Sequence, residues 1–179
     1  MFAIISELDA DSSIAVKVLW NRLHQACGLE EIFKLPTPHF TWFSADELNI
    51  PQAASITADI ADRSSCLSSY VFGLGIFAGE NPILYLPIVK SQAMFDLHAE
   101  IWRLIQPHAE RVNKYYAPAH WLPHITLAIK DLTFDNLACV LQSVAFEPVE
   151  LTIAIDNFTI VSQAGELSSK ALRHYLFCE

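Results

Sequence analysis

Residues 38–42 read PHFTW, and residues 123–127 read PHITL. The two strings are 85 residues apart, and each places a His and a Thr two positions from one another directly after a proline. With average residue usage, a given histidine carries this pattern by chance roughly once in two thousand. Two copies among 7 histidines therefore indicate a repeated structural unit.

Polar and apolar residues alternate along both strings, which is typical of a half-buried β-strand. Side chains two positions apart on a strand lie on the same face, about 6.6 Å from each other along it. His39 and Thr41 therefore share one face of the first strand, and His124 and Thr126 share one face of the second. The apolar residues between them point to the opposite face, where a helix can cover them.

The chain around the two strings alternates between strand and helix patterns. A strand-helix-strand unit is predicted at residues 2–44 and again at 83–129, which indicates an internal duplication. No linker separates the halves, so we expect an α+β fold in a single domain, 1–179, whose two similar lobes are about 1–82 and 83–179. The first helix should bury an apolar face that includes Ile14, Val18, Leu19 and Leu23, and it should end at Gly28. We expect strands at 2–8, 38–44, 67–77, 83–89, 123–129, 149–161 and 171–177. We expect helices at 14–28, from 91 to about 108–111 and from 131 or 133 to 145, and a helix or an irregular segment at roughly 51–63.

The charge balance narrows the class of partner. The 179 residues include 11 Lys+Arg and 20 Asp+Glu, which gives a formal net charge of −9. This excess of negative charge repels a long phosphate backbone, so we expect no long nucleic acid as partner and favour a small or terminal phosphodiester. The hydrophobic fraction of 53% indicates a globular protein with a large core.

No targeting or membrane segment is predicted. The N-terminus lacks the basic flank and the long apolar run of a signal peptide. The most apolar stretch, 67–89, contains glycines and the Gly-Glu-Asn-Pro turn at 79–82, which favours a strand hairpin over a bilayer span. We therefore expect a cytoplasmic monomer that does not bind a membrane.

The sequence also lacks the usual patterns of metal and cofactor sites. Cys27, Cys66, Cys139 and Cys178 form no CxxC pair, so we expect buried free thiols, although a disulfide is compatible with the spacing. Neither an H-E-x-x-H string nor a phosphate-cradling GxxxxGK[ST] loop occurs. We expect no metal and no cofactor, and ATP-dependent ligation is disfavoured.

Two imidazoles that face one another across a cleft can supply a base and an acid at the same time. The unperturbed pKa of histidine is near 6.5, and general acid or base catalysis contributes typically ~10² to 10⁴-fold. Thr41 and Thr126 could donate to the non-bridging oxygens of a phosphate. The alternative is that His39 and His124 are structural and that the threonines reflect β-propensity alone, but the repeat disfavours it.

The two H-x-T strings, each followed by an apolar residue and set in duplicated lobes, resemble the two-histidine (2H) phosphoesterase superfamily, and in particular its bacterial 2′-5′ RNA ligase and cyclic phosphodiesterase branch. The resemblance implies two antiparallel sheets around a central cleft with the helices outside. It also implies metal-independent catalysis by His39, Thr41, His124 and Thr126, on 2′,3′-cyclic or 2′-5′ phosphodiester bonds in RNA ends or small nucleotides. Which histidine is the acid is not specified by the sequence.

A basic and aromatic segment precedes the second string. Tyr115, Tyr116 and Trp121 could stack a nucleobase while Arg111 or Lys114 contacts phosphate, but packing within the loop is the favoured interpretation. Two other functions stay open beside the RNA-end enzyme. One is a phosphodiesterase for a non-RNA cyclic nucleotide or metabolite, and the other is a nucleotide or RNA-end binding module without significant turnover.

Overall fold

The structure is a computed structural model that describes residues 1–146, 148–163 and 169–177. The described strands form three sheets in which all paired strands are antiparallel. The largest sheet has the order β10-β9-β1-β2-β6, with β1 at Phe2–Glu7, β2 at His39–Leu48, β6 at Ala109–Val112, β9 at Asn157–Gln163 and β10 at Ser169–Leu176. A second sheet has the order β4-β5-β7, with β4 at Gly75–Phe77, β5 at Ile83–Pro87 and β7 at His124–Ile129. The remaining pair is β3, Leu67–Phe72, with β8, Glu150–Ile155, and an isolated bridge joins Val71 of β3 to Ile88, the residue after β5.

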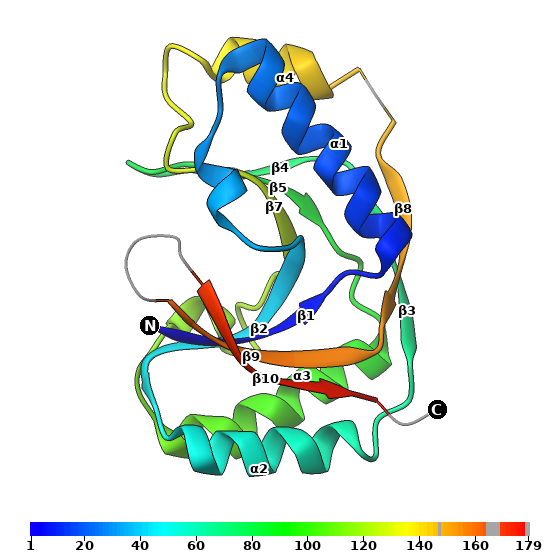
Figure 1. The fold of residues 1–179 in the computed structure, drawn as a ribbon, viewed down its shortest axis with the longest axis vertical. Coiled ribbons are helices and arrows are strands. Elements are labelled where there is room, and N and C mark those ends of the chain that lie inside the picture. The colour runs from blue at the N-terminus through cyan, green and yellow to red at the C-terminus, as the bar shows by residue number, and fades with distance from the viewer. Residues whose placement is uncertain (147, 164–168, 178–179) are drawn as a thin grey trace.

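Helices cover the outer faces of the sheets (Figure 1). α2 and α3 pack on each other beside the five-stranded sheet, while α1 and α4 pack on each other beside β7 and β8. The α-helices are α1 at Ala10–Cys27, α2 at Ile50–Ala61, α3 at Gln92–Ile105 and α4 at Leu137–Val144, and the short 3-10 helices are η1 at Glu31–Lys34, η2 at Gln106–His108 and η3 at Lys114–Tyr116. The predicted α+β class, with antiparallel sheets and outer helices, is confirmed.

Local capping explains where the first helix begins and ends. The Asp9 side chain accepts a hydrogen bond from Ser12 N, and Gly28 ends the helix in the left-handed conformation with φ 72°. The end at Gly28 agrees with the prediction. The buried face is only partly as predicted, because Ile14 and Val18 are exposed whereas Val16 and Trp20 are buried with the two predicted leucines.

The spatial lobes do not coincide with the sequence halves 1–82 and 83–179. The five-stranded sheet combines β1 and β2 with β6, β9 and β10, and α1 packs against strands of the second half. The predicted strand at 67–77 is divided at Gly73, which has φ 76°, so that only β4 forms the expected hairpin with β5. The predicted strand at 149–161 is likewise two strands, and β6 was not predicted. Each lobe therefore needs both halves of the chain.

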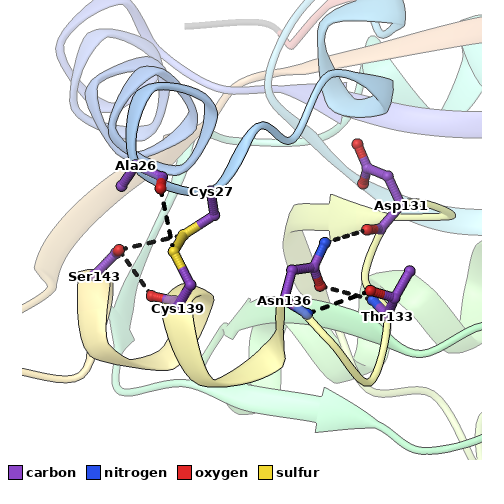
Figure 2. Close-up of a disulfide and its surroundings, with 7 residues drawn as sticks. All are labelled: Ala26, Cys27, Asp131, Thr133, Asn136, Cys139 and Ser143. Carbon is purple, nitrogen blue, oxygen red and sulfur yellow. Dashed lines mark hydrogen bonds between the residues drawn. A yellow bond between two sulfur atoms is a disulfide. The ribbon is translucent and has the colours of Figure 1, made fainter.

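The expectation of buried free thiols is wrong. Cys27, the last residue of α1, forms a disulfide with Cys139 of α4, and their Cα atoms are 5.9 Å apart (Figure 2). Cys66 is free but exposed, and Cys178 lies outside the described residues. The sequence separation of 112 residues hid the pair, since only the packing of α1 on α4 brings the two cysteines together.

The loops beside the disulfide are also tied to each other. Asp131 accepts hydrogen bonds from the backbone N–H groups of Glu30 (2.7 Å) and Glu31 (2.8 Å). Asn136 and Thr133 exchange side chain to backbone hydrogen bonds before α4, and Asn136 also donates to the Asp131 carbonyl (Figure 2). The loop that leads from α1 toward β2 is therefore fixed to the loop that follows β7.

Candidate active site

The two H-x-T strings lie on strands β2 and β7, which contact one another between the lobes. Their burial alternates as predicted: His39, Thr41, His124 and Thr126 are half-buried, and the apolar residues between and after them are buried. These buried partners are Phe40, Trp42, Ile125 and Leu127. The polar face of each strand is thus turned away from the core of its lobe.

Both motif strands pair with their neighbours in the same way. His39 is opposite Glu7 and Thr41 is opposite Ile5, while His124 is opposite Pro87 and Thr126 is opposite Tyr85. In each pair the register shifts just beyond the motif threonine, so that the following residue on the motif strand is unmatched. Such bulges bend a strand and redirect its side chains, and they are frequent beside active sites. The two motif strands therefore share the same local irregularity, while the duplication stays a prediction.

All four motif side chains line one cavity, which we call the central cleft. Its volume is about 160 Å³, and Tyr116, Leu35 and Ile83 contribute to the remaining walls. Among the described residues that line this cleft, none is Lys or Arg. The lining side chains that can donate to a bound anion are the two imidazoles and the hydroxyls of Thr41, Thr126, Ser44 and Tyr116.

The two histidines are oriented by equivalent backbone contacts. His39 Nδ1 lies 2.9 Å from the carbonyl oxygen of Thr37, and His124 Nδ1 lies 2.7 Å from that of Leu122. A carbonyl oxygen only accepts, so Nδ1 carries the proton in both rings and Nε2 is the atom that can exchange a proton with a ligand. The two imidazoles are thus prepared for the same chemistry.

Burial lowers the pKa of both motif histidines below the ordinary value of 6.5. The hydrogen bond to Thr37 and the nearby Glu7 carboxylate partly oppose this effect on the pKa of His39. Charge on His39 further lowers the pKa of His124. Electrostatic coupling of this kind favours a pair that holds one proton between two rings.

Two tryptophan side chains fix the backbone of the motif strands. Trp121 Nε1 donates to the carbonyl oxygen of Thr41 at 2.9 Å, and Trp20 Nε1 donates to that of Thr126 at 3.0 Å. Each indole comes from the other half of the sequence. The backbone carbonyl of each motif threonine therefore accepts a hydrogen bond from a side chain outside its own strand-helix-strand unit.

The aromatic residues that were predicted to bind the substrate differ in their surroundings. Trp121 is 2% exposed, and its ring stacks on His98 with centroids 3.8 Å apart, so it offers no face to a ligand. Tyr116 and Thr41 both line the central cleft, and burial raises the pKa of the Tyr116 hydroxyl. Tyr115 is 68% exposed beside it.

The two predicted phosphate contacts have other partners. Arg111 forms ion pairs with Asp46 (3.1 Å) and Glu47 (2.5 Å) on the exposed surface of β2, and the hydrogen bond to Glu47 raises the pKa of its guanidinium. Lys114 Nζ lies 5.5 Å from the centre of the Tyr115 ring. Neither side chain lines the central cleft.

A second cavity, which we call the side chamber, adjoins the cleft at His124. Its volume is about 450 Å³, and its walls come from the β4–β5 hairpin, from η3 and from the loop before β7. Phe77 and Tyr85 stack with centroids 4.1 Å apart, and both approach the His124 ring, at 4.9 and 5.2 Å. Sequence analysis missed these two aromatic residues, because their position depends on which strands pair with β7.

Comparison with known proteins identifies similar chains. A family model described as the 2′-5′ RNA ligase superfamily matches residues 11–166. The crystal structure of TT0787 of Thermus thermophilus is similar with a TM-score of 0.68 and 16% identity, over 98% of this chain and 97% of that one. The crystal structure of a phosphoesterase is similar with a TM-score of 0.66 and 13% identity, over 99% and 98%. Escherichia coli LigT, crystallised with 3′-AMP, has a TM-score of 0.62 and 12% identity, over 99% and 98%. No curated protein sequence matches significantly.

Proposed function

Because the chain belongs to the 2′-5′ RNA ligase superfamily, we propose that it hydrolyses, or in reverse forms, a phosphodiester at an RNA end or in a small cyclic nucleotide. The resemblance inferred from the two H-x-T strings is thereby confirmed, and it makes the chain an enzyme of the phosphoesterase kind. His39 and His124 act as the acid and base pair, and Thr41 and Thr126 donate to the phosphate oxygens. The reaction requires no metal.

The equivalent orientation of the two imidazoles carries this proposal. Both Nδ1 atoms are bound to backbone carbonyls, and both rings line the same cleft, so two Nε2 atoms serve one bound group. One neutral and one protonated ring can remove a proton from water and deliver a proton to the departing oxygen. A structural role alone would not account for two such rings in a shared cavity.

The walls of the cleft favour a phosphodiester that carries a single negative charge. One protonated imidazole matches that charge, and the hydroxyls of Thr41 and Thr126 can donate to the non-bridging oxygens as charge develops. Tyr116 lines the cleft with the motif threonines, so its hydroxyl is a further donor for the phosphate oxygens. The 3′-AMP bound to LigT supports a ligand of nucleotide size.

Hydrolysis of a panel of 2′,3′-cyclic nucleotides and cyclic-phosphate-ended oligonucleotides, with EDTA present, tests the proposal. We expect His39→Ala and His124→Ala each to lower kcat/KM by about 10² to 10⁴-fold. His108→Ala, a half-buried histidine outside both cavities, is the matched control and should keep the wild-type rate. Tight binding of a nucleotide without turnover would favour a binding module, and turnover of non-RNA cyclic esters alone would favour the other phosphodiesterase.

Cellular location and assembly are part of the proposal. In the part of the chain that the structure describes, no helix is long and apolar enough to cross a bilayer. We propose a cytoplasmic monomer, although the Cys27–Cys139 disulfide is of a kind that is rare in reducing compartments. Mass spectrometry of thiols alkylated in intact cells, together with light scattering of the purified protein, tests both points.

A further inference from the structure

The motif end of β2 is a sheet edge with an irregular backbone. β1 pairs with β2 from His39 onward, whereas β6 pairs with β2 only from Ala45, and no other described strand pairs with it. The register with β1 places Thr41 and Phe43 opposite consecutive residues, so Trp42 between them is unmatched. Backbone carbonyls at such a place receive no regular ladder bonds, and once buried they need other donors.

Two side chains supply these donors. Trp121 Nε1 donates to the carbonyl oxygen of Thr41 at 2.9 Å, and His98 Nε2 lies 3.1 Å from that of Trp42. A carbonyl oxygen only accepts, so Nε2 of His98 carries the proton. His98 belongs to α3 and Trp121 to the loop before β7, so both donors come from outside the five-stranded sheet. Two consecutive carbonyls at the bulge are therefore held by side chains of the second half of the chain.

Ring packing fixes the His98 side chain in this position. His98 is fully buried, and its ring stacks on that of Trp121 with centroids 3.8 Å apart and an angle of 2°. The Trp42 ring is nearly parallel to both, at 21° to His98 and 22° to Trp121. An imidazole that is packed in this way has little freedom to turn toward another acceptor. The position of the Trp42 carbonyl is thus tied to helix α3.

We propose that His98 is a positioning residue for the reaction at the central cleft: it holds the bulge at Trp42, and the bulge sets the direction in which Thr41 presents its hydroxyl. This inference rests on the proposed function. A bulge redirects the neighbouring side chains, and a donor to a reacting group must be placed to within a fraction of an ångström. Neither His98 nor Trp42 lines the cleft, so His98 acts only through the backbone of β2.

Kinetics of His98 variants on a 2′,3′-cyclic nucleotide test this role. Leucine fills the space but cannot donate, so we expect His98→Leu to lower kcat about tenfold and to change KM by less than about twofold. His98→Gln keeps a donor for Trp42 and should stay within about threefold of the wild-type kcat. Equal losses in the two variants would show that the hydrogen bond is not what matters.

A second variant on the same helix separates positioning from stability. Ile101 lies on the buried face of α3 one turn after His98. Ile101→Ala opens a cavity in the core and lowers stability without removing a donor to β2, so kcat at a temperature well below unfolding should equal that of wild type. A loss of kcat in Ile101→Ala as large as in His98→Leu would assign His98 a structural role only.

A double-mutant cycle shows whether His98 acts through the motif threonine. Thr41→Val removes the hydroxyl and should lower kcat about 10²-fold. Once the hydroxyl is gone its direction no longer matters, so His98→Leu should lower kcat of the Thr41→Val enzyme by less than about twofold more. A further tenfold loss in the double variant would mean that His98 acts by another route.

Crystal structures of the variants test the geometry without an activity assay. We expect the bulge at Trp42 to be retained in His98→Gln and rearranged, with a turned Thr41 side chain, in His98→Leu. If His98→Leu does not fold, His98→Asn replaces it, because its amide is one carbon too short to reach the Trp42 carbonyl. An unchanged bulge in the variant without the donor would refute the inference. Failure of the wild-type protein to hydrolyse any phosphodiester would instead refute the proposed function, and the structures would still decide whether His98 holds the bulge.

Discussion

His98 provides a quantitative test of how the motif strand β2 is supported. Its side chain is 0% exposed, it stacks on Trp121, and its Nε2 lies 3.1 Å from the carbonyl oxygen of Trp42. Burial lowers its pKa from the ordinary 6.5 to about 4. The unfolded chain therefore binds a proton at a pH where the folded chain does not, and the stabilisation by neutral His98 is lost as the pH falls from 6.5 toward 4.

The expected size follows from the two pKa values. Between pH 7 and pH 5 the contribution of His98 to the free energy of unfolding should fall by about 2 kcal/mol. Urea unfolding of wild type and of His98→Gln at both pH values measures it, since glutamine can still donate to Trp42 but does not titrate. His120→Gln removes an exposed histidine and should keep the wild-type dependence on pH. If His98→Gln loses as much stability as wild type between these pH values, the argument from burial is wrong.

Three further predictions concern stability and catalysis. Replacing both Cys27 and Cys139 by Ser should lower the free energy of unfolding by up to about 5 kcal/mol in urea, because the closed loop spans 112 residues, whereas Cys66→Ser should be nearly neutral. Gly75→Ala should lower the free energy of unfolding by about 1–3 kcal/mol, because a Cβ at this position overlaps the Tyr85 ring. It should also lower kcat, since the Tyr85 ring lies against His124. Unchanged stability and activity would contradict this packing. Burial lowers the pKa of both motif histidines, so the bell-shaped profile of kcat/KM should peak below pH 6.5, and a maximum above pH 7 would disagree.

The residues that could be predicted from the sequence are those whose position depends on local periodicity. The alternation around His39 and His124 is retained because each strand has one face on the core of its lobe. The end of α1 at Gly28 was likewise predictable, because only a left-handed residue suits that C-cap. The grouping of four motif residues in one cleft needed the duplication as well, since no local pattern relates positions 85 residues apart.

The features that escaped prediction depend on which elements become neighbours. The Cys27–Cys139 pair, the exchange of strands between lobes and the aromatic contacts of Phe77 with His124 all follow from tertiary packing. The role of Trp121 also depends on tertiary packing. Its place in an aromatic segment allowed a ligand contact beside the favoured interpretation of packing, and only the structure shows that its indole N–H donates to the Thr41 carbonyl and that its ring packs on His98.

Two histidines with equivalent backbone contacts do not by themselves show which one acts as an acid and which as a base. The backbone contacts of His39 and His124 repeat in both lobes, so neither these contacts nor the H-x-T strings distinguish the two histidines. The difference must come from parts of the chain that are not repeated around both, and the β4–β5 hairpin and η3 are such parts, because they build a chamber beside His124 only. The repeated motifs thus give two histidines with equivalent backbone contacts, while the unrepeated segments give these histidines different surroundings.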